Sequence, residues 1–324
     1  MLTALLCLLG THAAVAGGRG GAGSREVKTG GDSSGPALES RVSFKVEGSA
    51  QSEGSGPLTS TSVDWEPPAC WYEPYWKAKD FKTFMEAQWS IHESVGGAAE
   101  DIADDKARYK DFNADKNDEG MWWVAVKNPD MKDDPAAGTC TRDPFWVVNG
   151  ENPDVPQAID TETLAGLAYQ RTEVPDTEIS MAPAGKSTVN LPTWAWLDKA
   201  TFKTVSVTAS LAGTGLWATT TAKPVSLHID PGSDDALTSP SSGECTIKDD
   251  GSIGEPYATG KADETPPCGV TYLRSSGDDS YALKATLTWE ISWTGAGGTA
   301  GDLPNGTFAT TTDVQVQEIQ AVNR

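Results

Sequence analysis

In the second half of the chain, apolar side chains recur at every second position. The run YALKATLTWEISW, from Tyr281 to Trp293, is apolar at each odd-numbered position and mostly polar between them. Such alternation predicts a strand with one face in the core and the other in water. Shorter runs repeat the pattern over residues 205–211, 225–229 and 313–317. Because the run from Tyr281 exceeds the usual length of about five or six residues, we expect a bulge or bend in it.

Part of the first half has helical spacing instead. The run DFKTFMEAQWSIH predicts an amphipathic helix, with Asp80 as its N-cap and Gly96 and Gly97 at its end. Its apolar stripe consists of Phe81, Phe84, Met85, Trp89 and His92. Weaker patterns predict two further helices, over residues 98–109 and 161–169.

The change of period near residue 187 indicates two folded domains. We predict a Trp-rich α+β domain over residues 63–186 and an antiparallel β-sandwich over residues 187–324, so the expected fold class is mainly β. The sandwich resembles immunoglobulin or PKD-like domains. Residues 17–62 are rich in Gly and Ser and contain one strand-like run, RVSFKVE. They have too few apolar side chains to order themselves, so we expect a disordered tether.

The N-terminus predicts export. Residues 1–16 combine a short apolar run with Ala14, Val15 and Ala16, which fit the small-residue cleavage site of a secretory signal peptide. No later run approaches the roughly 20 apolar residues of a membrane helix, so we expect no membrane span in the mature chain. These features favour a secreted or cell-surface protein.

The cysteines favour the same compartment. Removal of the signal peptide leaves Cys70, Cys140, Cys245 and Cys268. An even number of cysteines in an exported chain predicts two disulfides. Three pairings exist, and we favour pairing between sequence neighbours because each couple then lies within one domain. Closing loops of roughly 70 and 24 residues would contribute about 4.4 and about 3.5 kcal/mol. The rival, a four-cysteine zinc site, lacks any Cys-x-x-Cys spacing.

The charge of the chain excludes several partners. The formal net charge is -21 and the isoelectric point is about 4.4. Neither nucleic acid nor an anionic membrane surface would be attracted to such a protein. With 324 residues and 12 Trp, the chain can bury a sizeable core.

One stretch, SMAPAGKST from Ser180 to Thr188, ends like a phosphate-binding loop. Such a loop follows a strand and precedes a helix whose N-terminal amides face the phosphates. Here Ser180 replaces the leading Gly, Pro183 stiffens the loop, and the following TVNLPTW is strand-like. We therefore expect an interdomain loop and no nucleotide binding.

Candidate catalytic residues are few. The mature chain has two histidines: His92 on the apolar stripe of the first helix and His228 on the polar face of a strand. No Gly-x-Ser-x-Gly elbow supports a Ser-His-Asp triad. Carboxylates such as Asp64, Glu66 and Asp154 could serve a glycosidase-like hydrolase, but nothing in the sequence selects a pair. We predict a noncatalytic protein without a cofactor.

The run DFNADKNDEG resembles the first half of a calcium-binding loop. Alternating positions hold Asp111, Asn113, Asp115 and Asn117. Lys116 replaces the required Gly, and Trp stands where the bidentate Glu should follow. An acidic surface turn is the favoured interpretation, and a calcium site is the alternative.

Aromatic residues give the strongest functional signal, because exposed aromatic side chains bind sugars and proteins whereas buried ones fill cores. A Pro-rich stretch directly after the tether contains Trp65, Trp71, Tyr72 and Trp76. We name these four residues as the candidate binding patch. Packing around a disulfide at Cys70 is the competing and favoured interpretation.

Eight runs between Val63 and Arg324 resemble a family of secreted actinobacterial proteins. They are VDWEPPACWYEP, GMWW, NLPTWAWLDKA, ATTTAKPVSL, GEPYA, PPCGVTYLRSSG, TWEISWTG and VQEIQAVN. Members of that family commonly carry the labels "enoyl reductase" or "ATP/GTP-binding protein". The residues contradict both labels, since an enoyl reductase needs alternating strands and helices in a dinucleotide fold. The resemblance supplies no site residues, and it implies an accessory role beside membrane proteins and ATPases of secretion type.

These observations predict a noncatalytic protein that binds another envelope protein or a wall polymer. A secreted carboxylate hydrolase and a lectin-like carbohydrate-binding protein are the alternatives. A close carboxylate pair in a deep cleft would favour the hydrolase, and a flat row of exposed Trp would favour the lectin. An apolar patch without either feature would favour the first prediction.

Overall fold

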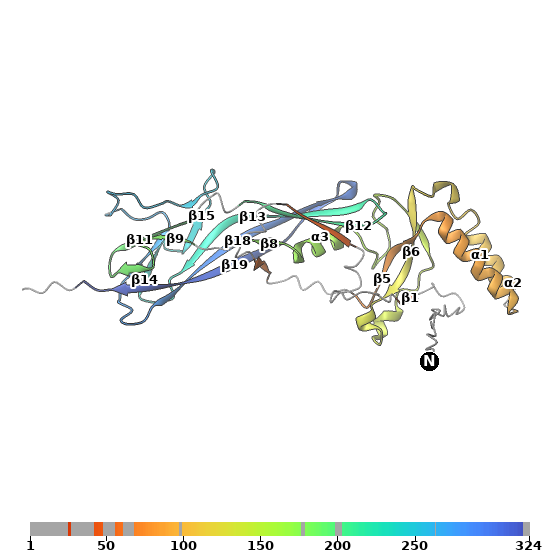
Figure 1. Ribbon diagram of the computed structural model, residues 1–324, viewed down its shortest axis with the longest axis horizontal. Helices are drawn as coiled ribbons and strands as arrows, with labels where there is room; N and C mark the ends of the chain where they lie inside the picture. The colour runs from red at the N-terminus through yellow and green to blue at the C-terminus, as the bar shows by residue number, and fades with distance from the viewer. Residues whose placement is uncertain are drawn as a thin grey trace, which may run out of the picture. The chain divides into compact units, whose positions relative to one another are not determined.

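The computed structural model describes most of the chain, and its fold is mainly β (Figure 1). The described residues are 25–26, 42–47, 56–60, 68–96, 99–175, 179–197, 203–262 and 264–319. The predicted signal peptide, residues 1–16, lies outside this part, as do Trp65 and most of the predicted tether. In the described part, no helix combines the length and apolar character needed to cross a membrane.

The chain forms two compact units. The first contains Glu66–Asp160 and Leu211–Leu216, and the second contains Ser43–Trp65, Thr161–Ser210 and Trp217–Arg324. The main division therefore falls before residue 161, earlier than the predicted boundary between residues 186 and 187. The intervening residues belong with the second unit because Tyr169, Val174 and Met181 lie in its hydrophobic core.

The first unit contains a four-stranded sheet and two helices. The sheet has the order β1-β6-β5, with β7 paired to β6. The elements are β1 Arg25–Glu26, β5 Cys70–Trp76, α1 Ala78–Ser94, α2 Ala99–Arg108, η2 Ala114–Lys116, β6 Gly120–Lys127, η3 Pro129–Met131, η4 Pro135–Gly138 and β7 Phe145–Val148. Helices α1 and α2 run side by side (Figure 1), and Ile102 of α2 shares a hydrophobic cluster with Phe81 and Trp89 of α1. The predicted second helix is thus confirmed within one residue at each end.

Helix α1 starts earlier than predicted and takes its cap from another segment. It begins at Ala78 with Lys77 in the cap position, so Asp80 lies in the first turn and is not the N-cap. The side chain of Asn117 instead accepts a hydrogen bond from the backbone N–H of Lys79 at 3.0 Å. A turn distant in sequence thus satisfies one of the amides that a helix N-terminus leaves unpaired.

The second unit contains an eight-stranded and a five-stranded sheet. The larger sheet has the order β10-β19-β18-β13-β12-β2, with β15 on β13 and β4 on β19. Its strands are β2 Val42–Glu47, β4 Thr59–Ser60, β10 Lys186–Thr188, β12 Val205–Leu211, β13 Leu216–Asp230, β15 Glu244–Thr246, β18 Tyr281–Gly295 and β19 Ala300–Gln317. Between β18 and β19 lies the short turn η5 Ala296–Gly298.

The five-stranded sheet has the order β14-β17-β11-β16, with β9 on β11. Its strands are β9 Ser180–Ala182, β11 Pro192–Leu197, β14 Ala236–Ser239, β16 Ile253–Gly254 and β17 Gly269–Tyr272. A separate pair joins β3 Gly56–Pro57 to β8 Glu173–Val174, and the one longer helix of this unit's described residues is α3 Thr161–Gln170. Side chains of both large sheets, such as Trp289 of β18 and Tyr272 of β17, belong to one hydrophobic cluster.

Strand β18 confirms the predicted alternation. Its odd-numbered positions from Leu283 to Trp293 are buried, and the positions between them are exposed or half-buried. The predicted irregularity is present as well, because the register against β19 shifts between Trp289 and Ile291. A bulge of this kind lets a long strand bend while it keeps its apolar face in the core.

The prediction of a disordered tether is wrong for four short segments of residues 17–62. Strand β1 pairs with β6, β2 with β12, β3 with β8 and β4 with β19. In β2 only Val42 is buried, so burial of side chains does not explain the order. Backbone hydrogen bonds to an exposed sheet edge can order a segment that has almost no core of its own.

The prediction of an interdomain loop at Ser180–Thr188 is also wrong. The stretch forms β9, which pairs with β11, and β10, which pairs with β19. Both strands belong to the second unit. No helix follows β10, whose next regular element is strand β11, so the geometry of a phosphate-binding loop is not formed here.

We predict that Lys186→Ala leaves stability and nucleotide behaviour unchanged. Lys186 is exposed at the start of β10, and surface substitutions of this kind change stability by about 0.5 kcal/mol or less. The melting temperature of the variant should fall within about 2 °C of wild type. Thermal melts with and without ATP and Mg²⁺ test this. Stabilisation of wild type by ATP, with none for the variant, would contradict it.

Candidate functional site

The candidate binding patch predicted from the sequence is mostly interior. Trp71 is 2% exposed and Tyr72 is 4% exposed, whereas Trp76 is half-buried. The fourth residue, Trp65, lies outside the described residues. Trp71 and Tyr72 are therefore not displayed to a partner in this structure, because β5 is buried along most of both faces.

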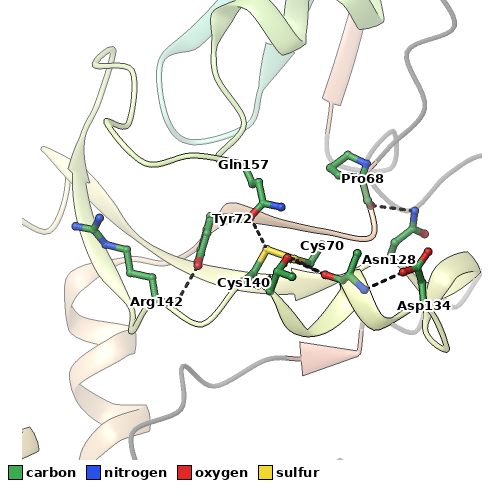
Figure 2. Close-up of a disulfide and its surroundings, with 10 residues drawn as sticks. Pro68, Cys70, Tyr72, Asn128, Asp134, Cys140, Arg142 and Gln157 are labelled. Atoms are coloured by element: carbon green, nitrogen blue, oxygen red, sulfur yellow. Dashed lines mark hydrogen bonds between the residues drawn. A yellow bond between two sulfur atoms is a disulfide. The ribbon is translucent and has the colours of Figure 1, made fainter.

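These aromatic side chains pack around a disulfide. The phenolic oxygen of Tyr72 accepts a hydrogen bond from the backbone N–H of Arg142 at 2.9 Å (Figure 2). The backbone N–H of Tyr72 donates to the carbonyl of Gln157 at 3.0 Å. The indole N–H of Trp71 donates to the carboxylate of Glu73 at 2.9 Å. Hydrogen bonds from Tyr72 of β5 thus fix the loop that follows Cys140 to the sheet. This arrangement agrees with the interpretation that these aromatic residues pack around the disulfide.

Both disulfides join sequence neighbours, as expected. Cys70 is bonded to Cys140 in the first unit, and Cys245 is bonded to Cys268 in the second. All four cysteines are buried. Each disulfide therefore closes a loop within one compact unit.

The candidate calcium residues surround the short turn η2. Asp111 and Asp115 are exposed, and Asn113 adopts a left-handed conformation with φ of 52°. The side chain of Asn117 is occupied by the N-terminus of α1. In the described part of the chain, no group of three or more His, Cys, Asp or Glu side chains could hold a metal ion. The geometry favours the acidic surface turn.

The two histidines have ordinary surroundings. His92 is exposed at the end of α1, so its place on the predicted apolar stripe is wrong. The stripe turns toward solvent in the last turns of the helix, where Ile91 is exposed as well. His228 lies on the polar face of β13, as predicted, with Nδ1 3.0 Å from a carboxylate oxygen of Glu244. Among the described residues, no serine or cysteine side chain is hydrogen-bonded to either histidine.

A different surface presents the apolar side chains that a partner could contact. In the five-stranded sheet, Ala195 and Leu197 of β11 point into the core, so Trp194 and Trp196 point the other way. The register places Leu237 of β14 and Thr271 of β17 on that same side. We call this surface the outer face; it consists of Pro192, Trp194, Trp196, Leu237, Tyr257, Thr271 and Leu273. Leu273 is included because it lies two residues after Thr271 and its backbone N–H donates to the carbonyl of Asp235, next to β14.

The outer face concentrates exposed apolar area. Leu237 is 59% exposed, Leu273 is 45% exposed and Tyr257 is 40% exposed. These are three of the ten large hydrophobic side chains that are exposed in the described part of the chain, and all three belong to this sheet or to its connecting segments. Clustering of this kind marks interaction sites, whereas single exposed apolar residues are normal.

The aromatic part of the outer face has a charged rim. Tyr257 contacts Trp194 edge to face with ring centroids 5.9 Å apart, and the amino group of Lys261 lies 5.2 Å from the centre of the same indole. Glu255 binds Lys248 at 2.6 Å and Lys261 at 3.2 Å. Hydrogen bonds from Lys248 and Lys261 lower the pKa of Glu255, so this carboxylate stays ionised at neutral pH. The rim thus holds Tyr257 and Lys261 over Trp194, which is only 2% exposed.

The sequence contains a signal for part of this surface. In the run PTWAWL every residue except Thr193 is apolar, so both faces of the strand are largely apolar, which is typical of a strand that is covered or bound on both sides. No comparable signal marks Leu237 or Leu273, because each lies in or beside a strand of only four residues, which is too short to show a periodic pattern. Their grouping depends on strand pairing over a long sequence separation.

Comparisons with known proteins found no relative of this chain. No family model matches this chain, no curated protein matches it, and no solved structure matches it.

Proposed function

We propose that this chain is a noncatalytic exported or cell-surface protein that binds another envelope protein through the outer face. The observation that carries the proposal is that Leu237 and Tyr257, which are 59% and 40% exposed, lie on the same side of the five-stranded sheet, and that Leu273, which is 45% exposed, directly follows β17 of that sheet. An apolar centre with a charged rim is the usual composition of a protein-binding surface. Lys248, Glu255 and Lys261 supply that rim.

The chemistry of the outer face favours a protein over a wall polysaccharide. Sugar rings stack on exposed aromatic faces, but Trp194 is covered and the most exposed side chains are leucines. Among the described tryptophans only Trp217 is exposed, and it lies on β13 of the other sheet. This pattern is an apolar patch without a row of exposed Trp. A wall polymer remains the alternative occupant.

The compartment is part of the proposal. The N-terminal sequence has the pattern of a secretory signal peptide, and two disulfides are typical of oxidising compartments outside the cytoplasm. The resemblance to secreted actinobacterial proteins implies a role beside a secretion-type membrane complex. A component of such a complex is therefore one envelope protein that the outer face could bind.

We also propose that the second unit is an immunoglobulin-like β-sandwich and the first an α+β domain. The shared hydrophobic cluster supports the sandwich, since it draws Leu287 and Trp289 from one sheet and Val270 and Tyr272 from the other. Two sheets that face each other across such a cluster would hold the outer face rigid. A rigid surface binds with less loss of conformational entropy than a flexible loop.

We predict that the double substitution Leu237→Asp with Leu273→Asp reduces capture of the envelope partner by about tenfold or more, because it places two charges in the apolar centre. Crosslinking on intact cells that express wild type or the variant, followed by quantitative mass spectrometry, measures capture. Both side chains are exposed, so the thermal transition should stay near that of wild type.

The matched control is Ile319→Asp, which adds a charge at a side chain that is 78% exposed and outside the outer face. It should capture the partner as wild type does. Equal capture by wild type and the double variant, with both folded, would contradict the proposal. Loss of binding to purified cell wall, with protein crosslinks unchanged, would instead identify the polymer as the occupant.

A further inference from the structure

Strand β14 forms an edge of the five-stranded sheet, beside the outer face. In the described part of the chain it pairs with β17 and with no other strand. The largest side chain in its sequence, ALTS, is Leu237, which is 59% exposed and belongs to the outer face. An edge strand with an exposed apolar side chain is a template to which another extended segment can pair.

The register shows which backbone groups of β14 point away from the sheet. The backbone N–H of Leu273 donates to the carbonyl of Asp235 at 2.8 Å. Because hydrogen-bonded pairs alternate along an antiparallel ladder, Leu237 directs its N–H and C=O toward β17, whereas Ala236 and Thr238 direct theirs outward. No described residue bonds to these outward groups, and Ala236 and Thr238 are only half-buried. The edge therefore offers accessible donors and acceptors for a further strand.

Short segments already pair with other sheet edges of this unit. Strand β2, of six residues, lies on the edge of β12, and strand β4, of two residues, pairs with β19. Backbone pairing thus holds segments that bury few side chains of their own. In the described part of the chain, β14 has no such segment beside it.

Charge indicates which kind of segment fits this edge. Asp234 and Asp235 are exposed at the start of β14. Arg274 lies 3.5 Å from Asp235, so one cation faces two carboxylates. The formal net charge of the chain is -21, so a second copy of the chain would be repelled, whereas a basic segment would be attracted.

We propose that the partner of the outer face binds as an extended basic segment that adds to β14 as a further strand. The backbone of this segment pairs with the outward groups of Ala236 and Thr238. One apolar side chain lies against Leu237, and a lysine or arginine two positions along the segment lies near Asp235, since alternate residues of a strand share a face. This inference rests on the proposed function, because it names how the partner of the outer face is bound.

Hydrogen exchange of the full-length exported protein, measured by NMR with the acetylated and amidated peptide Lys-Thr-Val-Thr-Lys, tests the proposal. At saturating peptide, exchange of the amide protons of Ala236 and Thr238 should slow by about tenfold or more, because both become hydrogen-bonded. The same peptide with glutamate at both ends should bind about tenfold more weakly, and added salt should reduce this difference. Unchanged exchange at both amides with the lysine peptide would overturn the proposal.

The substitution Thr238→Pro tests the same contact in the cell. It removes an N–H that points away from β17, and proline is tolerated at such edge positions, so the sheet should stay folded by circular dichroism. Capture of the envelope partner by crosslinking on intact cells should fall by about tenfold. The matched control Thr238→Ala removes the same side chain but keeps the N–H, and it should capture the partner as wild type does.

Comparison with the double variant Leu237→Asp, Leu273→Asp separates this inference from the proposed function. If the double variant loses capture while Thr238→Pro captures as wild type does, the outer face binds without strand addition and the inference is wrong. If both capture as wild type does, the proposed function is wrong as well. Equal loss in Thr238→Pro and Thr238→Ala would also overturn the inference, because the side chain and not the backbone would then make the contact.

Discussion

Replacing Trp71 with alanine is expected to lower the free energy of unfolding of the first unit by about 3 to 5 kcal/mol. The indole is 2% exposed and donates its N–H to Glu73 at 2.9 Å. Truncation therefore leaves a cavity and also removes one hydrogen bond to a buried carboxylate. Urea denaturation followed by near-ultraviolet circular dichroism measures the loss, since that signal depends on packed aromatic side chains.

Trp217→Ala is the matched control, because this indole is 39% exposed on β13. Its removal should change stability by about 1 kcal/mol or less, as is usual for surface substitutions. If the Trp71 variant unfolded at the urea concentration of wild type, Trp71 would have to lie at the surface. The candidate binding patch would then be restored as an alternative to the outer face.

Strong local periodicity explains why the long elements could be predicted. In β18, alternate side chains are apolar over the whole strand, so the buried face follows from the sequence alone. The bulge between Trp289 and Ile291 could be predicted because the strand is much longer than the usual length of about five or six residues. In the same way, α3 confirms the predicted third helix within one residue, because Leu164 and Leu167 lie one turn apart and are both buried.

Short elements could not be predicted because their stability comes from pairing partners. Strand β10 has three residues and is held by backbone hydrogen bonds to β19, more than a hundred residues away. The run RVSFKVE is strand-like in sequence, but β2 buries only Val42, so its order and its pairing with β12 could not be predicted. The cap of α1 has the same origin, since Asn117 is recruited from a separate turn. The spacing of apolar residues within a short segment does not reveal contacts with segments that are distant in sequence.

The exposure of the candidate binding patch also could not be predicted from local sequence. Adjacent residues of a strand point to opposite sides, so Trp71 and Tyr72 could both be buried only if β5 were covered on both faces. That covering comes from distant segments, including the backbone bridge between Tyr72 and Ala158. The outer face depends likewise on the pairing of β14 with β17, which aligns Leu237 with Thr271. Composition alone cannot distinguish an aromatic core from an aromatic surface.

Removal of the first disulfide is expected to have an effect of similar size. Replacing Cys70 and Cys140 with alanine should lower stability by about 4.4 kcal/mol, because the bond closes a loop of 70 residues. The corresponding change of Cys245 and Cys268, which are 23 residues apart, should cost about 3.5 kcal/mol. Hydrogen exchange followed by mass spectrometry reports peptides of each unit separately and measures both losses.

The two double variants serve as controls for each other, because each disulfide lies within one compact unit. Loss of protection should be confined to peptides of the unit that has lost its bond. Alanine suits this test because Cys70 is fully buried, and serine would add the cost of burying a hydroxyl group. Nonreducing peptide mapping of the exported protein should recover the same two pairs. A crossed pairing would show that the disulfides join the two units. Equal loss of protection in both units of one variant would show that each disulfide does not stabilise its own unit separately.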